Sequence, residues 1–314
     1  MKNNECTILV CSCDKYADLL RPFSDLWRKF WPDCPFDVML VTETEPSASL
    51  CFDRVIACGP GGNWCSRLVR ALGQIDTPYV LMLCDDYYLA KPVDTSLMLK
   101  RLSQIKTFDA ANLRMIPNPT PKANNSTPFG QGYDLLQYKP HTAYCIATQS
   151  GFWNRKFLLD LAKGKSSIWE FERYGSFDPI ITTKQLLVTP TKEFPFVDAV
   201  HKGYWETFGL AVCRENGIDL TGITRTLPPF KTRLIEGIKA LIFRIVPTTL
   251  LVRFQNRFAL GATEAMPAGG IALPTAPAPA GGIALPSEPS PDPAASEPSP
   301  DPVASEPPPA GGSK

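Results

Sequence analysis

Two adjacent carboxylates follow an uninterrupted apolar run in this chain. Residues 79–84 read Tyr-Val-Leu-Met-Leu-Cys, and Asp85 and Asp86 come directly after them. A run of this length and composition is typical of a buried strand. In an open α/β sheet, ligands bind at the carboxyl ends of such strands, where two acids can hold a hard divalent cation. The pair by itself is equally compatible with a solvated turn, so the surrounding elements must decide.

The first half of the chain alternates between strand-like and helix-like segments. Strands are predicted at 7–12, 36–41 and 53–58, and helices at 14–30 and 64–72, the second of these capped by Asn63. This order indicates a doubly wound α/β sheet. The second half is less regular, and its predicted elements are helices at 97–105, 154–162, 167–174 and 204–216 and strands at 110–115 and 141–147.

Three further motifs accompany the acid pair in a definite order. Trp64-Cys65-Ser66-Arg67 precedes Asp85-Asp86-Tyr87, and Trp169-Glu170-Phe171-Glu172 and then Gly203-Tyr204-Trp205 follow it. This set resembles the GT-A glycosyltransferases over residues 7–225, and within them the bacterial transferases of capsule and lipopolysaccharide (O-antigen) clusters. The acid motif departs from the common Asp-x-Asp form, because Cys84 stands where the first Asp is often found.

The resemblance implies a GT-A-like doubly wound mixed sheet with flanking helices, and an enzyme that moves a sugar from a nucleotide-sugar donor. It implies a UDP-linked donor, a glycan or lipid-linked glycan acceptor in surface polysaccharide biosynthesis, and Mn²⁺ or Mg²⁺ as cofactor. In such enzymes the metal bridges an acid of the motif and the donor diphosphate, and it offsets charge on the leaving group.

The same resemblance assigns metal ligands. Asp86 is expected to bind the metal, while Asp85 either shares it or accepts hydrogen bonds from sugar or ribose hydroxyls. His201 stands where several GT-A enzymes supply a late metal ligand, and Lys202 beside it is expected to meet the diphosphate. A lone histidine is more often structural, which is the alternative for His201.

Three polar residues follow the first two predicted strands. Ser12, Asp14 and Glu43 lie where a GT-A fold holds the base and ribose of the donor. An acid can accept hydrogen bonds from ribose hydroxyls or from a uracil N–H there. The alternatives are a helix N-cap for Asp14 and a solvated side chain for Glu43.

The helix before the acid strand begins with an anion-binding signature. Asn63, Trp64 and Arg67 occupy its first turn, where the helix dipole and free N–H groups favour negative charge. Arg67 can grip a phosphate with two hydrogen bonds. A surface salt bridge is the alternative for this arginine.

Two glutamates, Glu170 and Glu172, lie near the place where inverting GT-A enzymes carry their catalytic carboxylate. An inverting transferase needs one base that takes the proton of the acceptor hydroxyl. Residues two positions apart point to different sides of a helix, so only one of them can serve, and Glu172 is preferred. Asp178 is a further candidate, and helix capping or pairing is the alternative for each glutamate.

Aromatic faces for sugar rings are available at Trp153, Trp169 and Trp205, although tryptophans are more often core residues.

Bulk composition excludes other classes. The chain has 314 residues and a net charge of +1. It lacks a basic stripe interleaved with aromatic residues, which argues against nucleic-acid binding. None of its ten cysteines forms a Cys-x-x-Cys pair, which favours buried free thiols over a zinc site or a disulfide framework. With no signal peptide before the first strand, the sequence predicts a cytoplasmic protein.

The sequence divides into three parts. Residues 1–227 have the composition of one globular domain. Residues 228–261 are basic and amphipathic, which predicts a helix that lies on the inner face of the plasma membrane or packs on the domain. Residues 262–314 are a repetitive, acidic, Pro/Ala/Gly/Ser-rich tail that is expected to be disordered.

Two other functions remain open at this stage. A nucleotidyltransferase of sugar-nucleotide metabolism would use a similar sheet but favours a glycine-rich loop after the first strand, and residues 12–16 contain no glycine. A non-catalytic membrane-associated scaffold would use the tail for partners and the basic segment for membranes.

Overall fold

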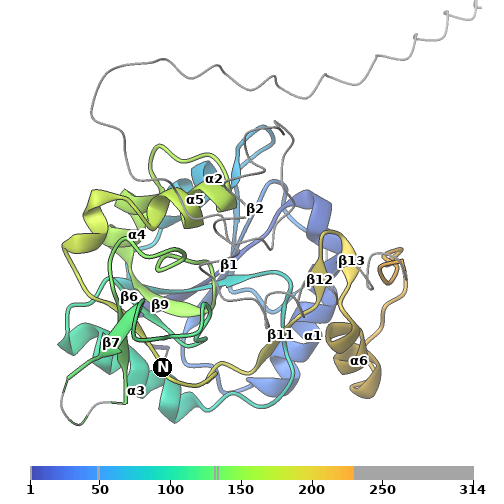
Figure 1. Cartoon of the computed structure of the whole chain (residues 1–314). Helices are drawn as coiled ribbons and strands as arrows, with labels where there is room; N and C mark the ends of the chain where they lie inside the picture. The colour runs from blue at the N-terminus through green and yellow to red at the C-terminus, as the bar shows by residue number, and fades with distance from the viewer. Residues whose placement is uncertain (1, 48–49, 131, 133, 230–314) are drawn as a thin grey trace, which may run out of the picture. The chain divides into compact units, whose positions relative to one another are not determined.

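The structure is a computed structural model in which residues 2–47, 50–130, 132 and 134–229 are described. The prediction of a disordered tail, and all but the first two residues of the predicted basic segment, lie outside the described residues. One mixed sheet organises the described part (Figure 1). Its strand order is β3-β2-β1-β4-β9-β6-β10-β8-β7. The expected doubly wound mixed α/β sheet with flanking helices is therefore confirmed.

The first four strands are parallel and form one half of this sheet. They are β1 (Cys6–Cys11), β2 (Asp37–Thr42), β3 (Arg54–Ala57) and β4 (Tyr79–Cys84). Every residue of β1 is buried, as expected for a parallel strand covered on both faces. The chain passes from β1 outward to β2 and β3 and then returns, so that β4 pairs with the other side of β1. The gap between the ends of β1 and β4 is thus a topological switch point, where open α/β sheets bind ligands.

The second half of the sheet is mixed. β9 (Gly151–Asn154) runs antiparallel between β4 and β6 (Asn112–Arg114). Beyond β6 lie β10 (Leu186–Val188), β8 (Leu136–Tyr138) and β7 (Ser126–Pro128). These strands have three or four residues each, which is why the sequence pattern alone did not reveal most of them.

Helices cover both faces of the sheet because side chains alternate along its strands. Ile8, Val10, Leu81 and Leu83 pack in a core with α1 (Leu20–Phe30) and α3 (Thr95–Thr107). Their neighbours along the same strands face α2 (Trp64–Leu72), α4 (Arg155–Ala162) and α5 (Ile168–Gly175). Side chains of Asn63, Asp94, Asn154 and Ser167 cap α2, α3, α4 and α5 in that order.

Two short antiparallel pairs carry later segments back to the acid pair. β5 (Tyr87–Leu89) pairs with β11 (Phe196–Asp198) in a register that sets Asp198 opposite Tyr87. β12 (Val200–His201) and β13 (Tyr204–Trp205) form a hairpin through Lys202 and Gly203, both at positive φ. Residues that are more than 100 positions apart in the chain thereby meet at the end of β4.

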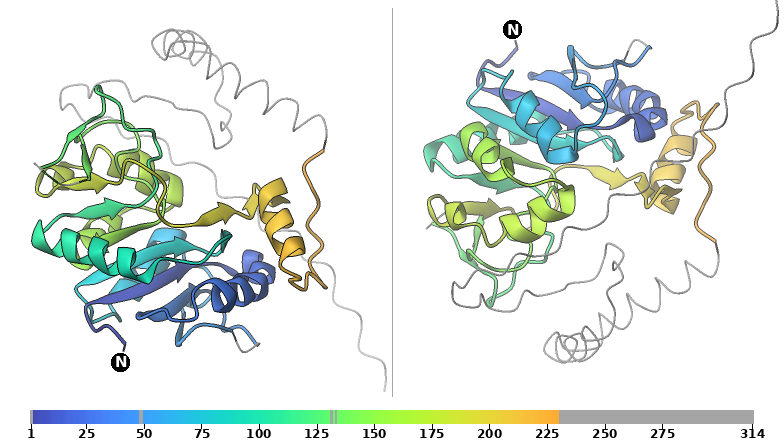
Figure 2. Two further views of the ribbon diagram at one scale, coloured as in Figure 1. Left: turned by 90° about the horizontal axis from the view of Figure 1, so that it is seen from below. Right: turned by 90° about the horizontal axis from the view of Figure 1, so that it is seen from above.

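The remaining helices of the described part are two 3₁₀ helices and α6. The 3₁₀ helix η1 (Asp14–Leu19) precedes α1, and η2 (Pro179–Thr182) precedes β10. α6 (Thr207–Glu215) follows the hairpin, and Figure 2 shows it, in yellow-orange, beside the blue segment that contains η1. Arg225 ties the last described residues to this place, since its guanidinium donates to both carboxylate oxygens of Asp18 at 2.7 Å.

One predicted element is wrong, and the helix predicted at 204–216 starts too early, since Tyr204–Trp205 is strand β13 and α6 begins at Thr207. Residues 141–147 alternate like an edge strand, but they form a chain of turns in which His141 and Tyr144 have φ of 59° and 58°. Their carbonyls do not join a ladder; the buried guanidinium of Arg114 donates to the carbonyls of Tyr144 and Cys145 instead. The strand that pairs with β4 in this region is β9, which begins at Gly151.

Candidate functional site

Asp85 and Ser12 bridge the topological switch point. Cys11 and Cys84 are paired neighbours, so the residues that follow them leave the sheet together. Ser12 Oγ donates to Asp85 Oδ2 at 2.5 Å, and both side chains are buried. Burial raises the pKa of Asp85 from 3.8 to about 7, against the lowering effects of the Ser12 hydrogen bond and the charge of Arg225. This carboxyl is therefore held in a place where its charge is poorly solvated.

Asp86 points to a cavity and has two acidic neighbours. Burial raises its pKa well above the usual range, and the charges of Asp85 and then Asp198 add to the effect. The backbone explains why Asp198 is close: β11 pairs with β5, and the N–H of Ala199 donates to the carbonyl of Asp86 at 2.8 Å. The pKa of Asp198 is also raised, chiefly because protein atoms surround it.

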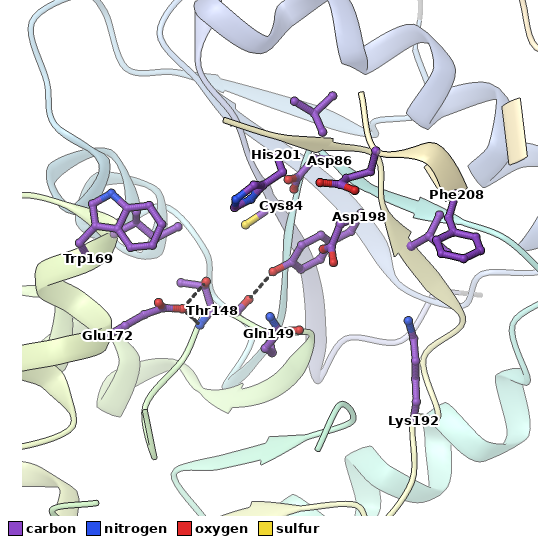
Figure 3. A pocket seen from close by; sticks show the side chains of 15 residues that line it. Cys84, Asp86, Thr148, Gln149, Trp169, Glu172, Lys192, Asp198, His201 and Phe208 are labelled. Carbon is purple, nitrogen blue, oxygen red and sulfur yellow. Dashed lines mark hydrogen bonds between the residues drawn. The ribbon is translucent and has the colours of Figure 1, made fainter. Parts of the chain in front are cut away.

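The donor set on this wall suits a hard divalent cation in charge and ligand type. Asp86 and Asp198 supply carboxylate oxygens whose mutual repulsion a cation would offset, and His201 lies beside them (Figure 3). Within the described ranges, no three such side chains are already arranged as a metal cluster.

The cavity itself has a volume of about 470 Å³. Figure 3 shows that Asp86, Asp198 and His201 gather on one side and that Glu172, Thr148 and Trp169 form the other. Its lining residues are Cys84, Asp86, Tyr87, Thr148, Gln149, Ile168, Trp169, Glu172, Lys192, Val197, Asp198, Val200, His201, Glu206 and Phe208.

Glu172 is a buried carboxylate on the second wall. It lies on α5, whose N-terminus Ser167 caps, and its Oε1 accepts hydrogen bonds at 2.7 Å from both the N–H and Oγ1 of Thr148. The hydroxyl of Tyr87 donates to the carbonyl of Thr148 at 3.4 Å, which links this wall to the residue after Asp86. Oε1 of Glu172 is thus held in place by Thr148.

Glu170 has a different place. Its carboxylate accepts from the N–H and hydroxyl of Ser166 at 2.7 and 2.8 Å, and Ser167 Oγ accepts from its backbone N–H. These bonds, those from Ser166 first, lower its pKa. It closes a reciprocal cap at the start of α5 and does not line the cavity. Asp178 likewise caps η2 and pairs with Lys165.

Three predicted donor-binding residues form one network outside the cavity lining. Glu43 accepts from the backbone N–H of Asp14 at 2.9 Å and from Arg67 at 2.8 Å. Asp14 in turn accepts from the N–H of Thr44 at 2.9 Å, and Arg67 also donates to the carbonyl of Gly62 at 2.6 Å. The structure therefore brings Asp14, Glu43 and Arg67 together where β1 and β2 end and α2 begins.

The other predicted residues are spread around this edge. Asn63 caps α2 by accepting from Ser66 N–H at 2.8 Å, and Trp64 packs against Phe171 with ring centroids 5.4 Å apart. His201 lines the cavity, whereas Lys202 sits in the hairpin turn outside the lining.

Sequence reasoning missed five polar residues of the cavity: Thr148, Gln149, Lys192, Asp198 and Glu206. Asp198 had a signal, because it lies three positions before His201 in a segment already expected to reach the metal. Lys192 had none; its ammonium donates to the carbonyl of Phe196 and lies 4.5 Å from the centre of that ring, and enclosure by protein lowers its pKa.

No family model and no curated protein matches this sequence. Similar solved structures include S. aureus TarS 1–349, at 12% identity and a TM-score of 0.39, over 62% of this chain and 59% of that chain. A cytidylyltransferase from Leptospira borgpetersenii matches at 11% identity and a TM-score of 0.36, over 68% and 96% of the two chains. A putative nucleotide-diphospho-sugar transferase from Desulfovibrio desulfuricans matches at 13% and 0.37, over 69% and 96%. At these values the likeness carries no argument about activity.

Proposed function

We propose that the protein is a metal-dependent glycosyltransferase. It would move a sugar from a nucleotide-sugar donor, UDP-linked in our proposal, to a hydroxyl of a glycan or lipid-linked glycan. The motif resemblance extends this proposal to surface polysaccharide biosynthesis. One observation carries it: Asp86, the second acid of the pair at the switch point, lines a cavity whose opposite wall holds a buried, hydrogen-bonded carboxylate, Glu172.

The first wall would bind the donor. Asp86 and Asp198, with His201, would hold a divalent cation, and this cation would offset charge on the departing diphosphate. Asp85, held by Ser12, would accept hydrogen bonds from the sugar or ribose hydroxyls. The network of Asp14, Glu43 and Arg67 lies at the ends of the neighbouring strands, where the base and ribose would bind.

The second wall would activate the acceptor. Thr148 orients Oε1 of Glu172, so Oε2 is the atom that would take the proton from the attacking hydroxyl. No described residue donates a hydrogen bond to Oε2. The walls of the cavity would also restrict water, which competes with the acceptor for the donor sugar.

A nucleotidyltransferase remains the alternative from the sequence, and the structure adds no observation in its favour. Such an enzyme would favour a glycine-rich phosphate loop after β1, but here η1 begins at Asp14. A scaffold would have no use for a buried carboxylate in a cavity beside an acid pair.

Thermal denaturation in the presence of nucleotides tests the proposal. We expect a UDP-sugar with Mn²⁺ to raise the melting temperature, by an amount that grows with ligand concentration, and the UDP-sugar without a cation to do so far less. Asp86→Asn should abolish the metal-dependent part. Asp160→Asn, which changes an acid on α4 that pairs with Lys156 and Lys163, should keep it.

Two outcomes would count against this proposal. If no nucleotide or sugar nucleotide stabilised the protein in a metal-dependent way, the glycosyltransferase assignment would be wrong. Release of pyrophosphate from a nucleoside triphosphate and a sugar phosphate would identify a nucleotidyltransferase instead.

A further inference from the structure

Trp169 is an exposed aromatic residue in the wall of the cavity. Half of its surface is exposed. The other two tryptophans with a candidate role in sugar stacking are buried, with exposed fractions of 0% for Trp153 and 3% for Trp205. Of these three, only Trp169 lines the cavity (Figure 3). An aromatic ring that lines a cavity together with polar groups can pack against a bound ligand.

The helix places this ring next to Glu172. Trp169 and Glu172 are three residues apart on α5, so their side chains lie on the same face, one turn from each other. Ser167 caps the helix, and Phe171 between them is fully buried against Trp64 and Trp153. The ring and the carboxylate are therefore held by the same rigid element, and their relative position does not depend on a loop.

Hydrogen-bonding groups line the same cavity as the ring. Thr148 and Gln149 line the cavity next to Glu172, and Gln149 carries an amide that can donate and accept. A pyranose ring has the matching shape, because its C–H groups form an apolar face while its hydroxyls point outward. An aromatic surface with a few convergent polar groups is the usual construction of such a small-molecule site.

The charges around this wall select against acidic sugars. Glu172 is the only ionisable side chain among Thr148, Gln149, Ile168, Trp169 and Glu172, and Asp86, Asp198 and Glu206 face it from the rest of the lining. The two basic groups of the lining, His201 and Lys192, lie on the side of Asp198, and the Lys192 ammonium already donates to the Phe196 carbonyl. A sugar carboxylate stacked on Trp169 would share the cavity with four carboxylates, those of Glu172, Asp86, Asp198 and Glu206.

We infer that Trp169, Gln149 and Glu172 form an acceptor subsite for the terminal ring of a neutral pyranoside. The ring packs on the indole, and one of its hydroxyls lies within reach of Glu172 Oε2. This inference rests on the proposed function, because it treats the second wall of the cavity as the acceptor side. It adds the chemical class of the acceptor and the residue that recognises its ring.

Saturation-transfer NMR tests the subsite directly. The probes are methyl β-glucopyranoside, methyl β-galactopyranoside, methyl N-acetyl-β-glucosaminide and, as the charged comparison, methyl β-glucuronide, each with the full chain in the presence of UDP and Mn²⁺. We expect signal from at least one neutral glycoside and none from the glucuronide. Trp169→Ala should weaken binding about tenfold, whereas Trp169→Phe should retain most of it.

Tyr174→Ala is the matched control. Tyr174 is also an exposed aromatic residue of α5, at 63%, but it does not line the cavity. Its replacement should leave glycoside binding unchanged. Equal weakening in Trp169→Ala and Tyr174→Ala, or no saturation transfer from any neutral glycoside, would overturn the subsite, and so would a preference for the glucuronide.

Failure of the subsite and failure of the proposed function give different results. If the donor side is as proposed and the subsite is not, UDP and Mn²⁺ still stabilise the wild type and Trp169→Ala has no effect on glycoside binding. If the proposed function itself is wrong, UDP and Mn²⁺ do not stabilise the wild type. Whenever UDP and Mn²⁺ stabilise the wild type, they should stabilise Trp169→Ala to the same extent.

Discussion

At the scale of residues, the two walls of the cavity hold their carboxylates in different ways. Asp85 and Asp86 are enclosed with few compensating donors, and their pKa values are raised. Glu172 is also buried, but Thr148 supplies two hydrogen bonds to one of its oxygens. In our proposal, the first arrangement would hold a cation and the second would orient a base.

The raised pKa of Asp85 predicts how stability changes with pH in protein freed of divalent cations. Between pH 3.8 and about 7 the unfolded chain ionises this group while the folded chain keeps it protonated. The unfolded state then binds fewer protons, so the free energy of unfolding falls as pH rises through this window. Urea denaturation of the wild type and Asp85→Asn across this pH window should show a smaller fall in the free energy of unfolding for the variant. If the free energy of unfolding changed with pH by the same amount in both proteins, the raised pKa of Asp85 would be contradicted.

Thr148 tests the orientation of Glu172. Thr148→Val removes the hydroxyl at nearly constant shape and leaves a buried carboxylate with one donor fewer. We expect a loss of about 1.5–3 kcal/mol in the free energy of unfolding and a lower kcat for sugar transfer. Thr148→Ser keeps the hydroxyl and should restore most of both. A valine variant as active as the serine variant would show that this hydrogen bond does not matter for transfer.

At the scale of elements, α6 positions the segment that carries Asp198 and His201. Gly209 of α6 lies against Ala199, and a Cβ at residue 209 would come within 2.4 Å of the Ala199 Cα. The helix begins directly after the β12–β13 hairpin, and the N–H of Glu206 donates to the carbonyl of Ala199 at 2.8 Å. The close packing of α6 on the Ala199 backbone therefore helps to hold Asp198 and His201 in the first wall of the cavity.

Gly209→Ala should disturb this wall. Because the clash involves backbone atoms, α6 or the segment around Ala199 must shift, at a cost of about 1–3 kcal/mol in stability. The shift should also weaken Mn²⁺-dependent nucleotide binding, which isothermal titration can measure. Gly73→Ala is the control, since a Cβ there meets only ordinary contacts of 3.5 Å or more at negative φ. If Gly209→Ala bound the nucleotide with unchanged Mn²⁺ dependence, α6 would not contribute to the position of the site residues.

At the scale of the whole molecule, the described part is built on one nine-stranded sheet with helices on both faces and two short strand pairs. Its last residues return to η1 through Arg225 and Asp18. Among the described residues, no helix has the length and apolar character needed to cross a bilayer. Membrane association through residues 228–261 stays a prediction of the sequence, and it has its own test.

Cosedimentation with vesicles measures this association. The full chain should bind vesicles that contain phosphatidylserine and should be released by high salt, because the attraction comes from basic side chains at an anionic surface. Lys239→Glu with Arg244→Glu should reduce binding. Lys100→Glu with Lys122→Glu, an equal charge change at exposed positions of the described part, should not. Equal effects of both double variants would point to net charge alone.

The sequence determined the strands and helices with long, regular patterns. The predicted segments for β1, β2, β3 and β4 agree with the structure to within a residue or two, and α2 and its Asn63 cap were placed correctly. Continuous apolar runs and capping residues are local signals, so they can be read without the rest of the chain. The acid pair after β4 was visible for the same reason.

Only the tertiary structure decided which of the candidate residues share a cavity. The sequence offered both Glu170 and Glu172 as candidates and preferred Glu172. The side-chain contacts with Ser166 and Thr148 separate the cap, Glu170, from the cavity carboxylate, Glu172. Asp198 reaches Asp86 through a pairing of three-residue strands. Such short strands are stabilised by non-local hydrogen bonds and burial, which leave no period in the sequence. The meeting of distant residues at the end of β4 is therefore a property of the fold.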